Sequence, residues 1–290
     1  GRERDHTEGA AGRPGAGGVA GQRLRGRRGP GRLGAPRGGG GVARRPRVGG
    51  VVADGVRGPG GRDAGHPQAR ENEVRLLLDA RARREQREHL VVARDAARLQ
   101  ALADRLTGET GAKVSVLPAD LTDRADVRTV EKRLREDADI SLLVNNAGIG
   151  PKGTLVEDDI DYLETMIELN VVAANRLAVA AAQAFAARGR GAIVNIASVV
   201  AYIPERFNGT YSATKAFVLN LTQAIHSEVA EKGVKVQAVM PGLTRTEIFE
   251  RVGRSFDQMP PSMVMDVNDM VDAALAGFDQ GELVTIPSLP

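Results

Sequence analysis

From residue 89 onward, short apolar runs alternate with longer amphipathic segments. Short apolar runs bounded by polar residues or glycine are typical of buried strands, whereas apolar residues spaced three and four apart are typical of helices with one buried face. The apolar runs predict strands within the segments 89–93, 112–120, 140–148, 191–198, 234–242 and 282–290.

The segments between these strands predict helices of about three turns or more. Strands that alternate with helices of this length favour right-handed crossovers and a parallel, doubly wound α/β sheet of the Rossmann-like kind. Ligands of such sheets lie at the carboxyl ends of the strands, and the polar motifs of this chain fall there. The predicted helices are 94–110, 123–138, 163–189 and 211–233.

The first 70 residues follow a different pattern. They are rich in glycine, arginine and proline, show neither helical nor strand periodicity, and contain no Lys, Asn, Ser, Ile, Phe, Tyr or Met. We expect 1–70 to be a low-complexity leader, disordered or non-native, and 71–290 to be the folded domain. One explanation of the leader is translation of a G/C-rich gene in the wrong frame or from a misplaced start. The other is a real Gly/Arg arm that binds RNA or acidic surfaces.

Composition narrows the classes of function. The leader carries 15 arginines and 5 acidic residues, whereas residues 71–290 carry 25 basic and 32 acidic residues, which argues against nucleic-acid binding by the folded body. The absence of cysteine excludes disulfides and thiol nucleophiles, and the scattered histidines favour no metal site. No apolar run approaches the roughly 20 residues of a membrane span, so we expect no span and a cytoplasmic protein.

The stretch NGTYSATKAF places Tyr211 and Lys215 four residues apart, which brings two side chains to one face of a helix. Such a pair arises by chance and is weak evidence alone. Asparagines, a serine and small residues accompany it at the predicted strand ends, where they would let a flat ligand approach the backbone. These are Asn145 to Gly148 (NNAG), Ser198, Met240 to Thr246 (MPGLTRT) and, within the long helix, Asn170.

The order and the spacing of these motifs resemble those of the short-chain dehydrogenase/reductase family, from about His89 to the C-terminus. The 13-residue interval from Ser198 to Tyr211 also matches. The family order is a D-[LV] pair, N-N-A-G, a helical Asn, a Ser, Y-x-x-x-K and P-G-x-x-x-T. The matching residues here are Asp120, Leu121, Asn145 to Gly148, Asn170, Ser198, Tyr211, Lys215, Pro241, Gly242 and Thr246.

The resemblance implies hydride transfer between a nicotinamide cofactor and a carbonyl or alcohol. Tyr211 would be the acid in reduction and the base in oxidation, because the ammonium of Lys215 lowers the pKa of a phenol from its usual value of about 10. Lys215 would also bind the nicotinamide ribose. Ser198 would donate to the substrate oxygen, and Asn170 would hold a water that links Lys215 to solvent.

The resemblance also implies the cofactor. Folds of this kind that prefer NAD place an acidic residue at the end of the second strand, whereas Ala93 stands here and Arg94 follows, which favours NADP over NAD. Asp120 and Leu121 would flank the adenine. The expected cofactor-binding residues are Arg94, Asp120, Leu121, Asn146, Ala147, Gly148, Tyr211, Lys215, Pro241, Gly242 and Thr246.

The family opens with a strand and the turn T-G-x-x-x-G-x-G, and here the pattern departs from it. Counting back from Arg94 leads to 68–75, which contains no glycine, and the glycine matches at 29–34 and 34–40 follow no predicted strand. We therefore expect the first strand to be missing, a helix within 71–89, and a glycine turn encoded in an adjacent reading frame upstream of residue 89. A second hypothesis follows, in which the chain is a cofactor-dead binding or scaffold protein with a basic disordered arm.

The substrate pocket and the oligomer are less defined. Residues 247–270, rich in methionine and proline, suit either a mobile lid or an irregular surface segment. A pocket lined by Ile149, Val200, Tyr202 and Phe207 would take a hydrophobic carbonyl or alcohol. Members of the family usually pair through two long helices, here around 166–188 and 211–231, so the resemblance implies a homodimer or homotetramer.

Overall fold

The computed structural model describes residues 47–51, 89–245 and 264–287, and side chains outside the first of these ranges. The described residues belong to one compact unit, Arg44–Pro290. Its centre is a seven-stranded sheet in the order β3-β2-β1-β4-β5-β6-β7, with every neighbouring pair parallel. The strands are β1 (Arg47–Val51), β2 (His89–Ala93), β3 (Val114–Pro118), β4 (Ile140–Asn145), β5 (Gly191–Ile196), β6 (Val234–Val239) and β7 (Val284–Thr285).

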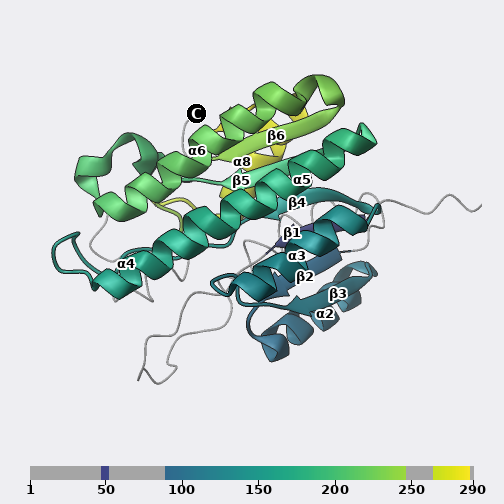
Figure 1. Cartoon of the computed structure of the whole chain (residues 1–290), viewed down its shortest axis with the longest axis horizontal. Coiled ribbons are helices and arrows are strands. Elements are labelled where there is room, and N and C mark those ends of the chain that lie inside the picture. Colours follow the sequence, from purple (N-terminus) through teal and green to yellow (C-terminus); the bar gives the residue numbers. More distant parts are fainter. Residues whose placement is uncertain (1–46, 52–88, 246–263, 288–290) are drawn as a thin grey trace, which may run out of the picture. The chain divides into compact units, whose positions relative to one another are not determined.

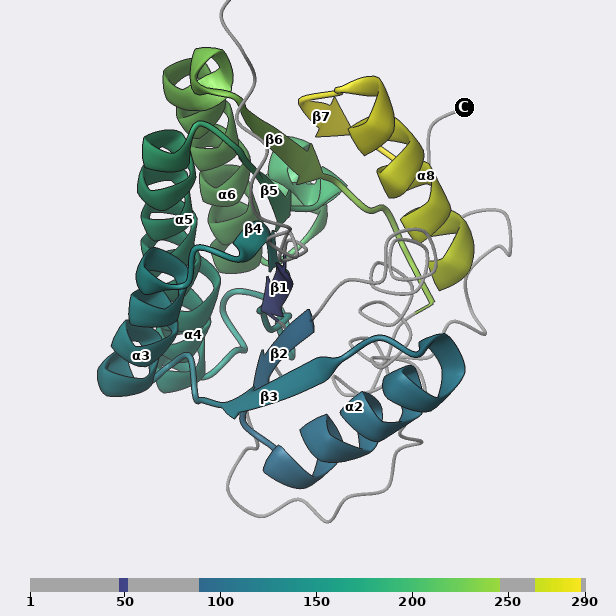
Figure 2. The ribbon, with the colours of Figure 1, turned by 90° about the vertical axis from the view of Figure 1, so that its right-hand side faces the viewer.

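Helices cover both faces of this sheet, which confirms the predicted doubly wound α/β fold (Figures 1 and 2). One face carries α3 (Arg124–Glu136), α4 (Ile160–Ile167), a π-helical turn η1 (Glu168–Ala173), α5 (Ala174–Arg188) and α6 (Gly209–Val229). The other face carries α2 (Ala96–Thr110) and α8 (Val267–Gln280). The short 3-10 turns are η2 (Val199–Tyr202), η3 (Pro204–Arg206) and η4 (Ala230–Lys232).

Burial of both sheet faces explains why the strands are almost continuously apolar. Val91 and Val92 are neighbours in β2 and both are fully buried, but Val91 packs with Leu99 of α2 and Val92 packs with the cluster beneath α3 and α5. Successive side chains of a strand point to opposite faces, so both faces need apolar residues once helices cover each of them. This requirement produces apolar runs instead of a clean alternation.

The prediction that the first strand is missing is wrong. Arg47–Val51 forms β1, which pairs with β2 on one side and with β4 on the other, at the centre of the sheet. A ladder is made by backbone N–H and C=O groups, so the weak strand propensity of the sequence RVGGV does not prevent pairing between two existing strands. These five residues lie within the stretch 1–70 that we expected to contain no element. The helix predicted within 71–89 lies outside the described residues.

Helix α8 was not predicted. Its signals are ordinary ones: Asp266 caps its start by accepting from the backbone N–H of Asn268, and Gly281 follows its end with a φ of 80°. It packs on the second face of the sheet through Val271 and Phe278 among others. We expected 247–270 to be a lid or an irregular segment, and α8 begins inside that range. Residues 246–263 lie outside the described part of the chain.

The continuous run Ile160–Arg188, which joins α4, η1 and α5, has the length and apolar composition of a membrane span. Of its most apolar window, 56% is buried inside the fold, as in the core helix of a soluble protein. One helix of this kind is weak evidence for a membrane.

Candidate active site

The predicted motifs at the ends of β4, β5 and β6 share one edge of the sheet. Asn145 is in register with Asn195, and Ile196 is in register with Val239, so the three strands end together. Ser198 follows β5 and is 9% exposed. Its hydroxyl donates to the carbonyl oxygen of Pro241 over 3.3 Å. The segments after β5 and β6 are therefore in direct contact.

Tyr211 and Lys215 lie in the first two turns of α6, which packs against β6 and η2. The Nζ atom of Lys215 is 5.8 Å from the centre of the Tyr211 ring and donates to the carbonyl oxygen of Ile196 over 3.0 Å. Lys215 is 7% exposed. The structure thus places the pair predicted from spacing at the end of β5, two residues before Ser198.

Asn170 lies in the π-helical turn η1 and is 2% exposed. Its Oδ1 accepts from the backbone N–H of Ile149 and its Nδ2 donates to the carbonyl oxygen of Ile149, both over 2.9 Å. Nδ2 also donates to the hydroxyl of Thr214 over 3.3 Å. Sequence reasoning predicted one continuous helix here. The π turn is a further finding, and such turns are frequent at functional sites.

Gly148 lies against the same side chains. A Cβ atom at this position would lie 3.1 Å from Oδ1 of Asn170 and 3.7 Å from Nζ of Lys215. Only glycine leaves this space open without displacing one of them. The structure therefore brings together Gly148, Asn170 and Lys215, three of the predicted site residues.

The first asparagine of NNAG has a structural role. Asn145 is 5% exposed, and its Nδ2 donates to the carbonyl oxygen of Ala174 over 2.9 Å, which ties the end of β4 to the start of α5. Asn146 is half-buried and Ala147 is 8% exposed. The motif thus fixes the long helix at the same edge of the sheet that carries the other motifs.

Arg94 and Asp120 lie beyond the ends of β2 and β3. The backbone N–H of Ala119 donates to the carbonyl oxygen of Ala93 over 2.9 Å, which holds the two strand ends together. The Arg94 guanidinium is 3.9 Å from the Asp120 carboxylate, and the two side chains are 24% and 39% exposed. Leu121 is 2% exposed, with its side chain in the core.

The segment after β6 is only partly described. Pro241 and Gly242 are half-buried, and Thr244 forms an isolated bridge with Met265, whereas Thr246 lies outside the described residues. Of the residues expected to line the pocket, Ile149 and Val200 are each 4% exposed, Phe207 is half-buried and Tyr202 is 59% exposed.

A separate open hollow of about 720 Å³ lies around the C-terminal half of α3 and the segment that precedes β4. Lys132 and Arg133 line it together with the carboxylates Glu136, Asp137 and Asp139, so its walls favour neither anions nor cations. It contains none of the predicted site residues.

Comparisons with known proteins identify the family of this chain. Residues 80–255, more than half of the chain, match the family model of the short chain dehydrogenase. The chain therefore belongs to the short-chain dehydrogenase/reductase family. This finding confirms, at the level of the family, the predicted Rossmann-like oxidoreductase that acts on alcohols or carbonyls.

Solved structures agree with this assignment. A short-chain dehydrogenase from Sphingobium yanoikuyae in complex with NADPH is 43% identical, with a TM-score of 0.73, over 83% of this chain and 88% of that chain. The bulky-bulky ketone specific alcohol dehydrogenase from Comamonas testosteroni is 41% identical, with a TM-score of 0.70, over 83% of this chain and 86% of that chain.

Among curated relatives, a very-long-chain 3-oxoacyl-CoA reductase from Anas platyrhynchos is 30% identical over 175 residues. The match covers 59% of this chain and only 56% of that relative.

Proposed function

We propose that the chain is an NADP-dependent oxidoreductase that transfers a hydride between a nicotinamide cofactor and a carbonyl or alcohol substrate. The observation that carries this proposal is the position of Lys215: its buried ammonium lies beside the Tyr211 ring, at the strand end that leads to Ser198. Tyr202 is 59% exposed beyond this serine, and Ile203 is 36% exposed, which favours a hydrophobic substrate.

The described residues fit a dinucleotide. Gly148 is half-buried and has no side chain, so a flat group can approach its backbone, and the exposed part of the Arg94 guanidinium suits a 2′-phosphate. Asp120 and the backbone of Leu121, whose side chain lies in the core, would hold the adenine, and Lys215 the nicotinamide ribose. When bound, the nicotinamide ring supplies or accepts the hydride. The other residues proposed to hold the cofactor are Asn146, Ala147, Tyr211, Pro241, Gly242 and Thr246.

The protein's own residues handle the proton and the charge. In reduction, the Tyr211 hydroxyl donates its proton to the substrate oxygen, and in oxidation the phenolate takes a proton back. The neighbouring ammonium of Lys215 stabilises the phenolate. The Ser198 hydroxyl, now donating to Pro241, turns to the substrate oxygen and stabilises the charge that develops there. Asn170 keeps the segment at Ile149 in place. It also holds a water that links Lys215 to solvent, through which the proton is replaced.

The experiment uses the full chain in three forms: unchanged, Tyr211→Phe and Ser198→Ala. We expect bound NADPH to show enhanced cofactor fluorescence or to raise the melting temperature in all three, and hydrophobic ketones to be reduced by the unchanged chain. We expect a loss of turnover of at least about 100-fold in both variants, because each removes a group that acts on the substrate oxygen. Normal turnover by Tyr211→Phe contradicts the proposed chemistry.

A cofactor-dead binding or scaffold protein is the second candidate. The observation that favours it is the absence of glycine from 68–75, where the family spacing places the phosphate turn. With β1 at Arg47–Val51, however, the chain continues as VADGVRGPGG, so that Gly55, Gly58 and Gly60 follow a strand in the sequence. A flat NADPH titration of the unchanged chain supports the scaffold and contradicts the enzyme.

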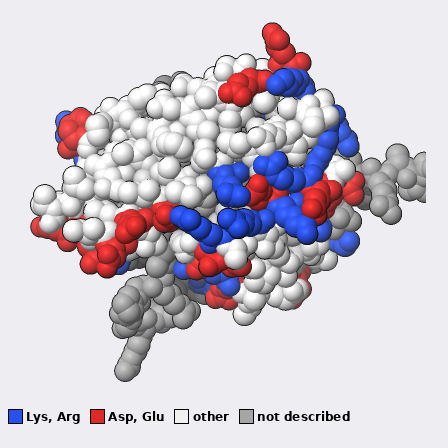
Figure 3. Space-filling view, viewed as in Figure 1, with Lys and Arg blue, Asp and Glu red and all other residues white. Residues whose placement is uncertain are grey.

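We also propose a homodimer, with cytoplasmic location. The face over α5 and α6 is largely uncharged (Figure 3), and the exposed positions Ala213, Phe217, Asn220 and Ala224 make an uncharged stripe along α6. Ile167 and Val172, 43% and 42% exposed, add apolar surface nearby. Such a patch marks an interaction surface.

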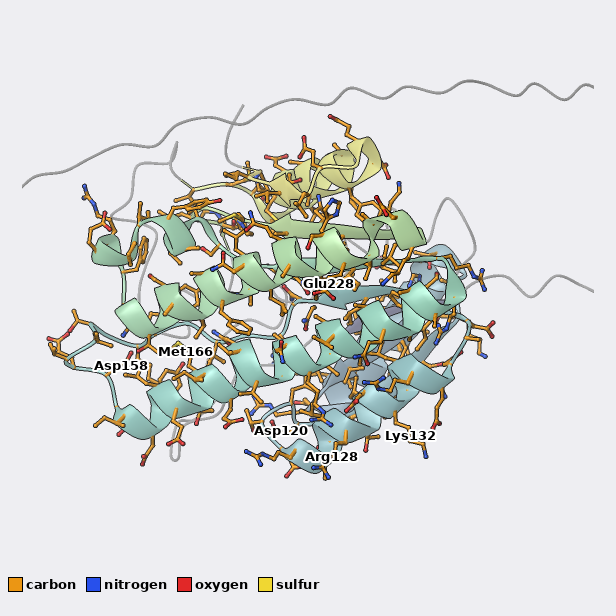
Figure 4. The ribbon with its side chains drawn as sticks, turned by 45° about the horizontal axis from the view of Figure 1, so that its top comes forward. Asp120, Arg128, Lys132, Asp158, Met166 and Glu228 are labelled. Atoms are coloured by element: carbon orange, nitrogen blue, oxygen red, sulfur yellow. The ribbon has the colours of Figure 1, made fainter. Side chains whose placement is uncertain are left out.

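The charges beside this face favour an antiparallel arrangement of two copies. Exposed acids lie on and before α4 at one end, and exposed bases on α3 and α5 at the other (Figures 3 and 4). A two-fold axis across the helices would bring unlike charges together, whereas one along the helices would bring like charges together. Sedimentation of Phe217→Glu should show monomers if this face is the interface. The charged residues are Glu157, Asp161, Glu164, Arg128 and Lys132, with Arg135 and Arg176, which are paired with Glu131 of the same chain.

A further inference from the structure

Asn208, three residues before Tyr211, uses both ends of its amide. Its Oδ1 accepts from the backbone N–H groups of Thr210 and Tyr211, over 3.0 and 3.3 Å, and so caps the start of α6. Its Nδ2 points the other way and donates to the carbonyl oxygen of Gly153 and to the carboxylate of Asp158, over 3.3 and 3.1 Å. Asn208 is 5% exposed and its partners Gly153 and Asp158 are half-buried, so these contacts are partly shielded from water.

Asp158 is the second half of this contact. It lies in the loop 150–159 that joins NNAG to α4, beside the start of α6 (Figure 4). Its Oδ2 accepts from the backbone N–H groups of Lys152 and Gly153, over 3.2 and 3.4 Å, as well as from Asn208. One carboxylate oxygen thus organises the loop and ties it to the helix that carries Tyr211.

The loop and the helix also touch through apolar atoms. A Cβ atom at Gly209, the first residue of α6, would lie 3.4 Å from Cδ2 of Leu155. Leu155 and Val156 are themselves 50% and 92% exposed, so they leave the loop with little apolar burial of its own. The polar contact with Asn208 is therefore the main described restraint on this loop from α6.

We propose that Asn208 and Asp158 are a positioning pair that fixes the loop 150–159, which directly follows Ile149 of the expected pocket, relative to Tyr211 and so sets the distance between this loop and the tyrosine hydroxyl. The inference rests on the proposed function, because the reaction is what the pair positions. Neither residue touches the reacting atoms. Correct placement of a reacting group contributes strongly to rate, and a displacement of about 1 Å costs up to about 100-fold.

The choice of side chains supports this role. Serine, aspartate and asparagine all cap a helix about equally well, but of these only asparagine also donates from a second atom. A residue selected for capping alone would not need the amide nitrogen. The pair therefore makes a testable distinction between capping and positioning.

The experiment compares Asn208→Ser with Asn208→Ala, Asp158→Ala and Asp158→Asn in the full chain. Serine keeps the cap but is too short to reach Asp158, whereas asparagine at 158 keeps the acceptor oxygen. We expect Asn208→Ser and Asp158→Ala each to lower kcat/KM for a ketone about tenfold, with the Kd for NADPH unchanged. Asp158→Asn should stay within about threefold of the unchanged chain.

A double variant tests whether the two residues act through each other. If they form one contact, Asn208→Ser with Asp158→Ala should lose about tenfold in total, instead of the about 100-fold that independent effects would give. Glu157→Ala is the matched control, because the carboxylate of Glu157 accepts from Thr154, within the same loop, and makes no described contact with α6. A loss in Glu157→Ala as large as that in Asp158→Ala would overturn the proposal, as would full additivity.

A readout that needs no turnover separates this inference from the proposed function. Amide hydrogen exchange of the segment around Lys152 and Gly153 should be faster in Asn208→Ser than in the unchanged chain. It should be at least as fast in Asp158→Ala, which removes the acceptor of these two N–H groups, and the double variant should exchange at the same rate as Asp158→Ala. Unchanged exchange in Asn208→Ser overturns the pair. An unchanged chain without reductase activity contradicts the proposed function alone, since the exchange experiment still decides whether the two residues hold the loop.

Discussion

The ammonium of Lys215 is bound to the carbonyl oxygen of Ile196, the last residue of β5, over 3.0 Å. Strand β5 is paired on both sides, with β4 and with β6, so this carbonyl has little freedom to move. The contact fixes a buried positive charge relative to the sheet and, one helical turn away, to Tyr211. The position of the charge therefore follows from the central sheet and not from a surface loop.

Replacing Lys215 with methionine should abolish most of the activity. The variant keeps the length and the apolar part of the side chain but removes the charge that favours the phenolate of Tyr211. We expect kcat to fall at least about 100-fold and the pH profile of the remaining oxidation to move to higher pH. Steady-state rates across pH check this, with Lys232→Met, an exposed lysine of η4, as the control. An unshifted profile would contradict the electrostatic role.

Replacing Asn170 with alanine should lower stability as well as activity. The amide makes two bonds with the backbone of Ile149, which is itself 4% exposed, so alanine leaves a buried N–H and a buried C=O without that partner. Each such loss costs about 1–3 kcal/mol, and we expect the free energy of unfolding to fall by about 2–4 kcal/mol. Urea denaturation checks this.

Gln100→Ala is the control for that measurement, because Gln100 is exposed on α2, away from the proposed dimer face. It should change the free energy of unfolding by less than about 0.5 kcal/mol. Equal losses in the two variants would show that the bonds to Ile149 carry no particular stability.

Most of the sheet could be predicted because strands that are buried on both faces consist of consecutive apolar residues, as at Val91 and Val92. Strand β1 could not, because RVGGV has no apolar run and is held by backbone pairing with its neighbours. Helix α8 had two signals in the sequence, the cap at Asp266 and the glycine at 281. The methionines and prolines of 247–270 favoured a lid or an irregular segment instead.

The candidate site was predictable where spacing along one element decides proximity, as for Tyr211 and Lys215. It was not predictable where two distant segments meet. The link from Asn208 to Asp158 spans 50 residues, and the bond from Asn170 to Thr214 spans 44. The cap at Asn208 was readable from the sequence before the helix, but its second partner was not. Such contacts depend on the tertiary structure.

Asp120→Asn should increase the preference for NADPH over NADH. The Asp120 carboxylate lies 3.9 Å from the Arg94 guanidinium that we expect to bind the 2′-phosphate, and its charge repels that phosphate. Asparagine keeps the oxygen that accepts from Thr122 but removes the charge. We expect the ratio of the NADH Kd to the NADPH Kd to rise about fivefold at low salt and less at high salt.

Fluorescence titration with both cofactors measures this ratio. A change in adenine binding does not alter the ratio, because NADH and NADPH carry the same adenine and both Kd values change equally. Asp104→Asn is the control, because it removes an exposed carboxylate of α2, away from Arg94 and Asp120, and should leave the ratio unchanged. A fall of the ratio in Asp120→Asn would show instead that the carboxylate is needed to hold Arg94 in place for the phosphate.

Glu131 should make stability depend on pH in the acidic range. Its partial burial raises the pKa of this carboxyl, but hydrogen bonds from Arg135 and Arg176 and their charges outweigh that effect and hold the pKa below its ordinary value of 4.5. Because the folded pKa is lower than the unfolded one, the unfolded chain binds more protons in this range, and stability rises with pH. The contribution is present above pH about 5 and is lost as the pH falls through the folded pKa.

Glu131→Gln should therefore cost about 0.5–1 kcal/mol in the free energy of unfolding at pH 7 and nothing at the lowest pH at which the chain stays folded. This range is expected for partly exposed ion pairs: the Glu131 side chain is 15% exposed, and those of Arg135 and Arg176 are 43% and 45% exposed. Urea titrations at pH 7, 5 and 4 measure the difference between the variant and the unchanged chain. Glu228→Gln, an exposed residue of α6 (Figure 4), is the control, and it should cost less than Glu131→Gln at pH 7. A difference for Glu131→Gln that stays constant from pH 7 to 4 would show that the bonds to Arg135 and Arg176 do not depend on the charge of the carboxylate.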